Sequence, residues 1–314
     1  MIPFEYRTPR SLKEVHATLK EFGSDAKLIG GGTSLVIMMR QRLVRPNCLV
    51  SLRSVRGLNS IEIHDGGTRI GGLATHREVE SSSLLRRRLP ILAETYHHVA
   101  TIRVRNMATV GGGLAHADPN QDPPPTLIAL GATVKATSAD GSRVIPLDEF
   151  FTDYYETVLK PDEIVTEVFV PKMAANSAGA YLKFLPRTAD DYATVSAAAV
   201  LTLDKTGKTI NDVRIALGSV GVTPIRATAA EAVLRGQPLK AEAFAEAGEK
   251  AKEAVDPVSD FRGSAAYKKE MAGVFVRRAL EKALATLRQQ AKQRPGLKAI
   301  KKAIKKAVKK GKKR

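Results

Sequence analysis

Cysteine is nearly absent from this sequence: Cys48 is the only one in 314 residues. A single thiol excludes an intrachain disulfide, and it also excludes an iron–sulfur cluster held by about four thiolates of this chain. We therefore expect any redox chemistry to use an organic cofactor or a metal on a partner chain. Cys48 stands beside Leu49 and Val50 and is expected to be a small buried hydrophobic residue.

Long hydrophobic runs are also missing. No apolar stretch approaches the roughly 20 residues needed to span a bilayer. The N-terminus, residues 1–6, has neither the basic segment nor the apolar core of a secretory signal. The cytoplasm is therefore the expected compartment, and the length allows two or three compact domains.

The usual nucleotide-binding fingerprints do not occur. The sequence contains no G-x-x-x-x-G-K-[ST], and the glycines at 30–32 lack the third spaced glycine of a dinucleotide-binding turn. These absences argue against a P-loop hydrolase and against a nicotinamide-binding parallel sheet.

Positive charge is abundant but unevenly distributed. The formal net charge is +18, and residues 291–314 carry twelve Lys and Arg with no Asp or Glu, which leaves +6 for the rest of the chain. We do not expect nucleic acid as a partner of that body. In the tail, apolar pairs such as Ala299 and Ile300 recur every four residues. The tail is therefore expected either to be disordered or, as a helix, to contact an anionic membrane surface, an acidic partner or nucleic acid.

Two glycine-rich segments about 80 residues apart carry the main functional signal. They are residues 27–35, with Gly30 to Gly32, and residues 108–119, with Gly111 to Gly113. Glycine lets successive backbone N–H groups approach one ligand closely, which suits a phosphate. Two such segments, each with a hydroxyl residue, predict a ligand with two phosphates held from both sides; the alternative for either one alone is a tight turn between buried elements.

Carboxylates follow the second segment. Asp118 and Asp122, with Pro119 between them, are placed in a rigid loop that suits a ribose hydroxyl. His116 and Asp118 alone are too few for a metal site, so no metal is expected.

The pattern of elements predicts an α+β protein. Residues 1–55 indicate strand, helix, strand, helix and strand, and Asp65-Gly66 marks a hairpin. Further helices are expected at 83–99, 126–130, 226–234, 241–255 and 265–290, and strands at 133–137, 164–170, 180–185, 194–203 and 212–219. A linker is expected at 173–179. The expected domains are 1–175, divided into 1–56 and 57–175, then 178–290 and the basic tail 291–314.

With these motifs the chain resembles the FAD-binding medium subunits of the molybdenum hydroxylases, the xanthine dehydrogenase and aerobic carbon monoxide dehydrogenase family. The resemblance covers residues 1 to about 287. Its motifs are residues 4–9, 27–35, 72–76, 105–112, 115–119 and 161–165, Lys183 with Arg187, and residues 191–193.

The resemblance implies a two-subdomain FAD-binding fold of the vanillyl-alcohol-oxidase (PCMH) type, followed by a smaller α+β domain with an antiparallel sheet and helices. It implies that Asp122 binds the adenosine side or its ribose, that Ile164 and Val165 pack near the ring system, that Lys183 lies by the flavin's polar edge, and that Tyr192 lies near the isoalloxazine. The residues implied around the pyrophosphate are Lys27, Leu28, Ile29, Gly30, Gly31, Gly32, Thr33, Ser34, Leu35, Ala108, Thr109, Gly111 and Gly112.

One residue departs from the family pattern, because Gly113 stands where relatives commonly have Asn. The resemblance further implies an oxidoreductase complex with a molybdopterin-binding large subunit and a small subunit with two [2Fe-2S] clusters. In it this chain passes electrons from those clusters through FAD to an external acceptor, in the cytoplasm or at the inner face of the membrane. Two alternatives remain open at this point: a self-sufficient FAD-dependent oxidase or reductase, and a non-enzymatic binding module.

Overall fold

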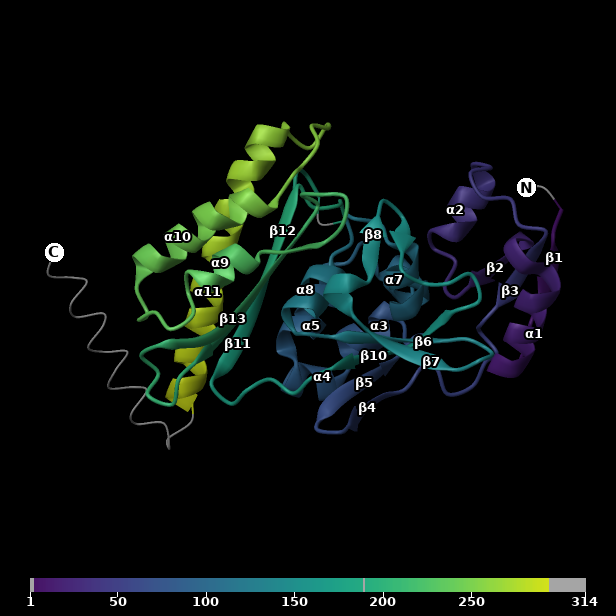
Figure 1. The fold of residues 1–314 in the computed structure, drawn as a ribbon, viewed down its shortest axis with the longest axis horizontal. Coiled ribbons are helices and arrows are strands. Elements are labelled where there is room, and N and C mark those ends of the chain that lie inside the picture. Colours follow the sequence, from purple (N-terminus) through teal and green to yellow (C-terminus); the bar gives the residue numbers. More distant parts are fainter. Residues whose placement is uncertain (1–2, 189, 294–314) are drawn as a thin grey trace, which may run out of the picture.

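Three units follow one another along the molecule (Figure 1). The computed structural model describes residues 3–188 and 190–293. The N-terminal unit lies at one end, a five-stranded sheet with its helices lies in the middle, and the C-terminal sheet with its helices lies at the other end. From residue 294 on, the predicted basic tail lies outside the described residues.

The N-terminal unit has the predicted order of elements. Its strands form a parallel sheet in the order β1-β3-β2. Ser11 caps α1 by accepting a hydrogen bond from the Glu14 amide, and Cys48 is fully buried, as expected. The elements are β1 (Glu5–Arg7), α1 (Leu12–Phe22), β2 (Ala26–Ile29), α2 (Leu35–Arg40) and β3 (Cys48–Ser51), with a 3-10 turn at Gly23–Asp25.

The middle unit is built on an antiparallel sheet in the order β4-β5-β10-β6-β7. Asp65 and Gly66 join its first two strands at positive φ, which confirms the predicted hairpin. The strands are β4 (Ile61–His64), β5 (Gly67–Gly71), β6 (Thr133–Thr137), β7 (Ser142–Pro146) and β10 (Ile164–Val170); β8 (Phe151–Asp153) and β9 (Glu156–Thr157) form a separate pair, after a 3-10 turn at Leu147–Glu149.

The helices of the middle unit correct two expectations. The helix predicted over 83–99 is two helices, because Leu89 leaves the helical conformation and Pro90 begins a new helix. The helix expected at 126–130 begins earlier, because Pro123 to Pro125 form its first turn, where their missing N–H groups cost nothing. The helices are α3 (His76–Ser81), α4 (Ser83–Arg88), α5 (Pro90–His97), α6 (Ile102–Met107), α7 (Val110–His116) and α8 (Pro123–Ala129).

The C-terminal unit is an antiparallel sheet in the order β11-β12-β13-β14, followed by helices. Its first strand begins at Ser177, inside the linker expected at 173–179, because residues 177–179 already pair with 200–202. The elements are β11 (Ser177–Phe184), β12 (Val195–Leu203), β13 (Ile210–Gly218), β14 (Ile225–Arg226), α9 (Thr228–Ala232), α10 (Ala241–Ala251), a 3-10 turn at Lys252–Ala254, and α11 (Ala265–Gln293).

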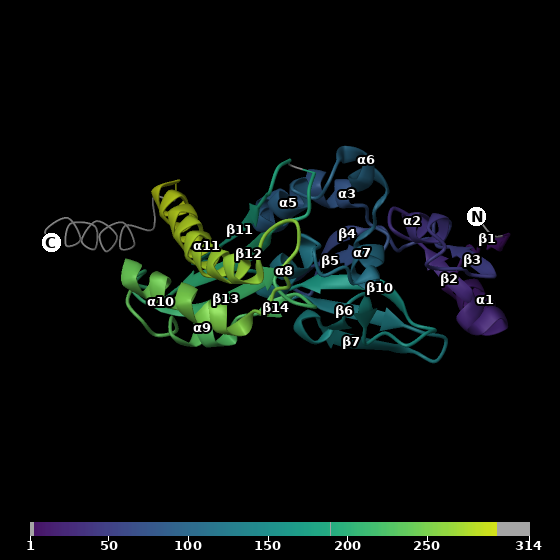
Figure 2. The same cartoon turned by 90° about the horizontal axis from the view of Figure 1, so that it is seen from above.

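The C-terminal sheet is buried on both faces. Helix α11 packs on β11 and β12 from one side, and α5 and α8 of the middle unit pack from the other, as Figure 2 shows from above. Successive residues therefore enter different cores: Ala197 and Ala199 face the C-terminal helices, while Ala198 joins the core of the middle unit. This packing holds the C-terminal sheet beside α8, the helix that follows the second glycine segment.

Candidate cofactor-binding site

The first glycine segment connects β2 to α2 and presents free backbone donors. Among the described residues, none accepts a hydrogen bond from the amides of Gly30, Gly31, Gly32, Thr33 or Ser34. No side chain caps α2 either. A row of unpartnered amides at a helix start is an anion-binding arrangement. We call residues 30–34 the first bend, and its donors fit a pyrophosphate.

The glycines of the second segment lie in the first turn of α7. Thr109 caps this helix, since its hydroxyl accepts a hydrogen bond from the Gly112 amide at 3.2 Å. The amides of Val110 and Gly111 donate to the carbonyls of Ala74 and Gly72. The helix turn and its neighbours therefore use most of the backbone donors of this segment. In this second bend, residues 108–112, the Thr109 amide donates to none of the described residues.

The two bends lie together, as expected, because the glycines of the first bend pack against the start of the second. A β-carbon on Gly31 would lie 1.8 Å from the Met107 carbonyl oxygen, and one on Gly30 would lie 2.7 Å from the Thr109 hydroxyl oxygen. Only a hydrogen fits at these positions. The free amides of the first bend are thus held against the start of α7.

Strand β10 packs against the second bend and against Gly72. A β-carbon on Gly72 would lie 2.1 Å from the Val165 carbonyl oxygen, and one on Gly111 would lie 3.0 Å from the same atom. The Ile164 and Val165 side chains are buried in two different hydrophobic cores. Any contact of these two residues with a cofactor therefore has to come from their backbone rather than from side-chain packing.

The remaining first-segment residues frame the bend. Lys27 is exposed on β2, while Leu28, Ile29 and Leu35 are half-buried at its two ends. On the other side, Ala108 is buried.

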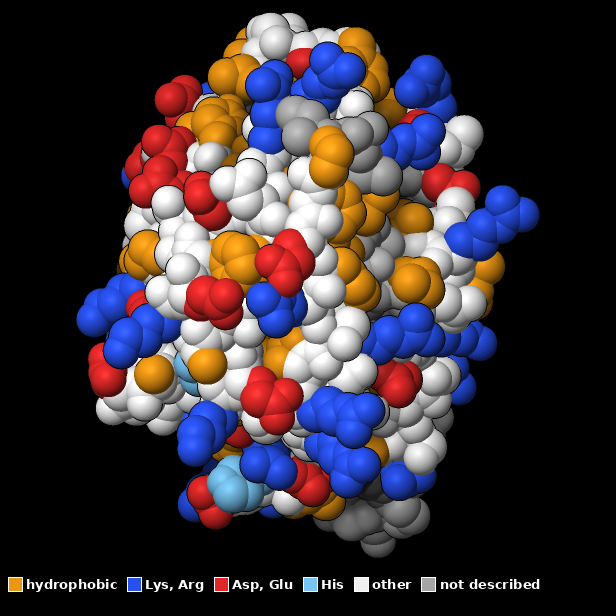
Figure 3. All heavy atoms as spheres, turned by 90° about the vertical axis from the view of Figure 1, so that its right-hand side faces the viewer, with side chains coloured by type: hydrophobic (Ala, Val, Ile, Leu, Met, Phe, Trp, Pro, Cys, Tyr) orange, Lys and Arg blue, Asp and Glu red, His pale blue; other side chains and the backbone are white. Residues whose placement is uncertain are grey.

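The sequence segments around the two bends contain no acidic residue. Residues 26–61 contain six Lys and Arg and no Asp or Glu, and residues 95–117 contain two Arg and no acid. Figure 3 looks at the end formed by the N-terminal unit and shows Lys and Arg side chains prominent along its right-hand side. Such a charge distribution attracts an anionic ligand over a distance.

Asp122 and Lys183 form a buried ion pair across the domain boundary. Lys183 Nζ lies 2.9 Å from Asp122 Oδ2, and both side chains are almost fully enclosed. The Tyr181 hydroxyl donates to the other carboxylate oxygen, and Lys183 also donates to the His98 carbonyl at 3.0 Å. Burial raises the pKa of Asp122, while Lys183 and the Tyr181 hydroxyl oppose that shift. The structure thus brings together Asp122 and Lys183, which were expected at the adenosine side and at the flavin edge respectively.

Tyr192 is an anchored aromatic side chain with an open face. It lies between β11 and β12 and is 49% exposed. Its hydroxyl donates to Asp118 Oδ2 at 2.8 Å, and the Arg262 guanidinium lies 5.8 Å from the ring centre. Burial of the hydroxyl and the charge of Asp118 raise its pKa, which keeps it a donor. Asp118 is itself buried and also binds the Asn120 amide, so it is not free for a ribose.

Gln121 fills the space beside Gly113. Its amide nitrogen donates to the Gly113 carbonyl at 2.8 Å, and its side-chain oxygen would lie 3.0 Å from a β-carbon on Gly113. A carboxamide from the loop after α7 therefore occupies the space that a side chain at position 113 would fill.

Sequence reasoning missed the supports behind the second bend. Thr75 and Glu78 form a reciprocal capping box at the start of α3, a spacing that is visible in the sequence. Buried Glu80 binds Arg105 of α6 at 2.9 Å, and Arg105 also donates to the carbonyls of Val99 and Ala100. No sequence signal linked those residues.

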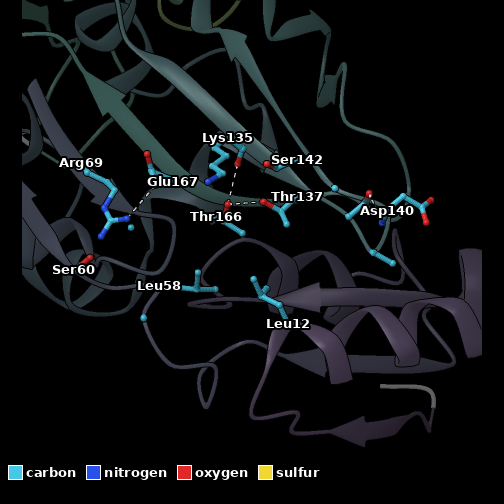
Figure 4. A pocket seen from close by; sticks show the side chains of 15 residues that line it. Leu12, Leu58, Ser60, Arg69, Lys135, Thr137, Asp140, Ser142, Thr166 and Glu167 are labelled. Carbon is cyan, nitrogen blue, oxygen red and sulfur yellow. Dashed lines mark hydrogen bonds and ion pairs between the residues drawn. The ribbon is translucent and has the colours of Figure 1, made fainter. Parts of the chain in front are cut away.

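A cavity of ≈ 470 Å³ lies on the other face of the middle sheet, between that sheet and α1 (Figure 4). Arg69, Lys135, Thr166 and Glu167 line it, and neither bend does. Arg69 is already paired with Glu167. The free donors of the first bend therefore make the better cofactor site.

Within residues 3–188 and 190–293, no cluster of three or more His, Cys, Asp or Glu is arranged to hold a metal ion. In the same part of the chain, no helix is long and apolar enough to cross a membrane.

The glycines of the first bend pack against the start of the second where the N-terminal and middle units meet, and an α+β unit follows, an arrangement that fits an FAD-binding subunit of a dehydrogenase. Residues 2–173 match the family described as "FAD binding domain in molybdopterin dehydrogenase", and residues 180–283 match the "CO dehydrogenase flavoprotein C-terminal domain". The chain therefore belongs to the family of FAD-binding medium subunits of multi-subunit molybdenum hydroxylases, which are oxidoreductases, and its cofactor is FAD.

Several relatives agree along nearly the whole chain. The carbon monoxide dehydrogenase medium chain of Hydrogenophaga pseudoflava is 38% identical over 287 residues, covering 91% of this chain and 99% of the relative. The 6-hydroxypseudooxynicotine dehydrogenase complex subunit alpha of Paenarthrobacter nicotinovorans is 37% identical and covers 90% and 94%. The solved carbon monoxide dehydrogenase of Hydrogenophaga pseudoflava has a TM-score of 0.87 at 40% identity, covering 91% of this chain and 99% of the matched chain.

Proposed function

We propose that this chain is the electron-exit subunit of its complex, passing electrons from iron–sulfur clusters of a partner to an external acceptor through FAD. The observation that carries the proposal is the row of five unpartnered amides in the first bend, held against the start of α7. When bound, FAD supplies chemistry that accepts electrons singly or in pairs. The chain then has to bind and orient it.

The proposal assigns the pyrophosphate to the backbone of residues 27–35 and 108–112, with hydroxyl bonds from Thr33 and Thr109. Lys183 would lie by the polar edge of the flavin, held there by Asp122, and the open face of Tyr192 would lie near the ring. Domains 1–175 and 178–290 would each contribute to this site.

Two partner chains are part of the proposal: a molybdopterin-binding large subunit and a small subunit with two [2Fe-2S] clusters. One cysteine cannot hold such clusters, so the electrons must arrive from another chain. The names of the relatives support an assembly, since they are called medium chain and complex subunit. The carbon monoxide dehydrogenase of Hydrogenophaga pseudoflava, solved in a form that lacks the Mo-pyranopterin moiety of the molybdenum cofactor, supports a molybdenum-containing partner.

The test is to purify the chain alone and with candidate partners from neighbouring genes. We expect stoichiometric flavin absorbance, no substrate oxidation by the chain alone, and acceptor reduction by the complex that is lost when FAD is removed. A folded chain without affinity for FAD, or substrate turnover by the isolated chain, would contradict the proposal.

The proposal extends to the tail, residues 291–314, as a contact with an anionic membrane surface at the cytoplasmic side. Its twelve positive charges without an acid support this. Salt-sensitive pelleting with vesicles that contain anionic lipid, lost on deleting residues 295–314, would support the contact. Equal pelleting of both forms would exclude it.

A further inference from the structure

Lys183 donates hydrogen bonds to both ends of residues 98–122, the segment that contains the second bend. His98, whose carbonyl accepts one Lys183 N–H at 3.0 Å, lies just before α6. Asp122, which accepts another at 2.9 Å, begins α8 just after α7. One ammonium group of the C-terminal domain thus contacts the chain on both sides of the second bend. That ammonium lies at the junction where the middle and C-terminal units meet.

One N–H of this ammonium is left over. An ammonium has three donors, and among the described residues only Asp122 and His98 accept from Lys183. The side chain of Lys183 is 3% exposed and that of Asp122 is 5% exposed, so bulk water screens neither charge fully. A third donor in such surroundings is suited to an acceptor atom of a ligand at this junction.

The pair is also electrically balanced. Tyr181 donates to the second carboxylate oxygen of Asp122, a hydrogen bond that favours the charged form of the carboxylate and fixes it in place. The negative charge 2.9 Å from Lys183 offsets much of the positive field that the ammonium would otherwise project towards a ligand.

We propose that Asp122 is a positioning residue that holds Lys183 at the polar edge of the flavin and offsets its charge, and so lowers the reduction potential of the bound FAD. This inference rests on the proposed function. Two-electron reduction of FAD with uptake of one proton gives the anionic FADH⁻. A nearby positive charge stabilises that anion more than the neutral oxidised ring, so a less compensated Lys183 raises the potential.

The experiment is a reductive titration of the FAD-loaded chain with dithionite and a redox dye, together with FAD binding measurements on the apoprotein. Asp122→Asn keeps the shape and removes the negative charge, so we expect a higher potential. Lys183→Met removes the positive charge, so we expect a lower one. Each change should alter the ratio of the dissociation constants for oxidised and reduced FAD about tenfold, which is about 30 mV for a two-electron couple.

The double variant Asp122→Asn/Lys183→Met leaves no uncompensated buried charge and is expected between the two single variants. If Asp122→Asn does not fold, the double variant must still lie above Lys183→Met. Asp140→Asn changes an exposed carboxylate in the β6–β7 turn and serves as the control.

A purely structural role for Asp122 would weaken folding without moving the potentials in opposite directions. If FAD binds and the Asp122→Asn potential equals that of the control or falls, the inference is overturned while the proposed function stands. If the unaltered chain binds no FAD, the proposed function itself fails.

Discussion

The carbonyl oxygen of Met107 occupies the space in which residue 31 would carry a side chain: a β-carbon on Gly31 would lie 1.8 Å from it. Gly31 is required for this contact and not for backbone freedom, because in the same bend Gly32, at φ 73, is the residue with a left-handed conformation. The two bends can therefore approach this closely only because residue 31 has no β-carbon.

Gly31→Ala should separate the bends. The added methyl group meets backbone, which cannot rotate away, so either the first bend or the end of α6 has to move. We expect FAD to bind at least about tenfold more weakly, a loss of about 1.4 kcal/mol, measured by flavin fluorescence during titration of the apoprotein. The control is Gly66→Asn, because its hairpin turn is open and Asn tolerates a positive φ. Unchanged affinity in Gly31→Ala would show that the bends do not hold the cofactor together.

Thr109→Ala removes the cap of α7, and Thr109→Ser keeps it. The Thr109 hydroxyl accepts from the Gly112 amide, and losing such a cap costs about 1 kcal/mol of stability. Urea unfolding should therefore show a lower free energy for the Ala variant and a near-normal value for the Ser variant. FAD affinity should follow the same order, because the hydroxyl also faces Gly30 of the first bend. Equal unfolding free energies and equal FAD affinities in the two variants would show that the hydroxyl neither stabilises α7 nor contributes to FAD binding.

Local sequence patterns predicted helices, strands and turns better than they predicted which distant residues contact one another. The order of strands and helices in residues 1–55 and the Asp65-Gly66 turn follow from local signals, and both formed as expected. The triple glycine at 111–113 predicted a phosphate-binding segment or a tight turn, but hydrogen bonds to the carbonyls of Gly72 and Ala74, distant in sequence, hold this segment as a helix turn. The pairing of Asp122 with Lys183 likewise depends on how two domains meet. No spacing rule connects residues 61 positions apart.

Glu231→Ala should be strongly destabilising. This carboxylate is fully buried and accepts hydrogen bonds from the Ile215 amide and from the guanidinium groups of Arg226 and Arg235. Removing one partner of a buried charged network costs about 3–5 kcal/mol. Urea unfolding monitored by circular dichroism measures the loss. Glu253→Ala removes an exposed carboxylate paired with Lys250 and should cost less than about 1 kcal/mol. Similar losses in the two variants would contradict this account.

His76 should make the protein less stable as the pH falls from about 6.5 to about 4. Burial, with a smaller opposing contribution from the Thr109 backbone and a further lowering by Arg105, reduces the pKa of His76 from 6.5 to about 4. Between those values the unfolded chain binds a proton at this residue and the folded chain does not, so acid favours unfolding.

The full shift corresponds to about 3 kcal/mol, reached near pH 4. His76→Gln cannot gain the charge, so the decline of its unfolding free energy between pH 6.5 and pH 4 should be shallower than in the unaltered protein. Urea unfolding at half-unit pH steps gives both curves. Parallel curves for His76→Gln and the unaltered protein would show that His76 accepts its proton in the folded state as readily as in the unfolded one.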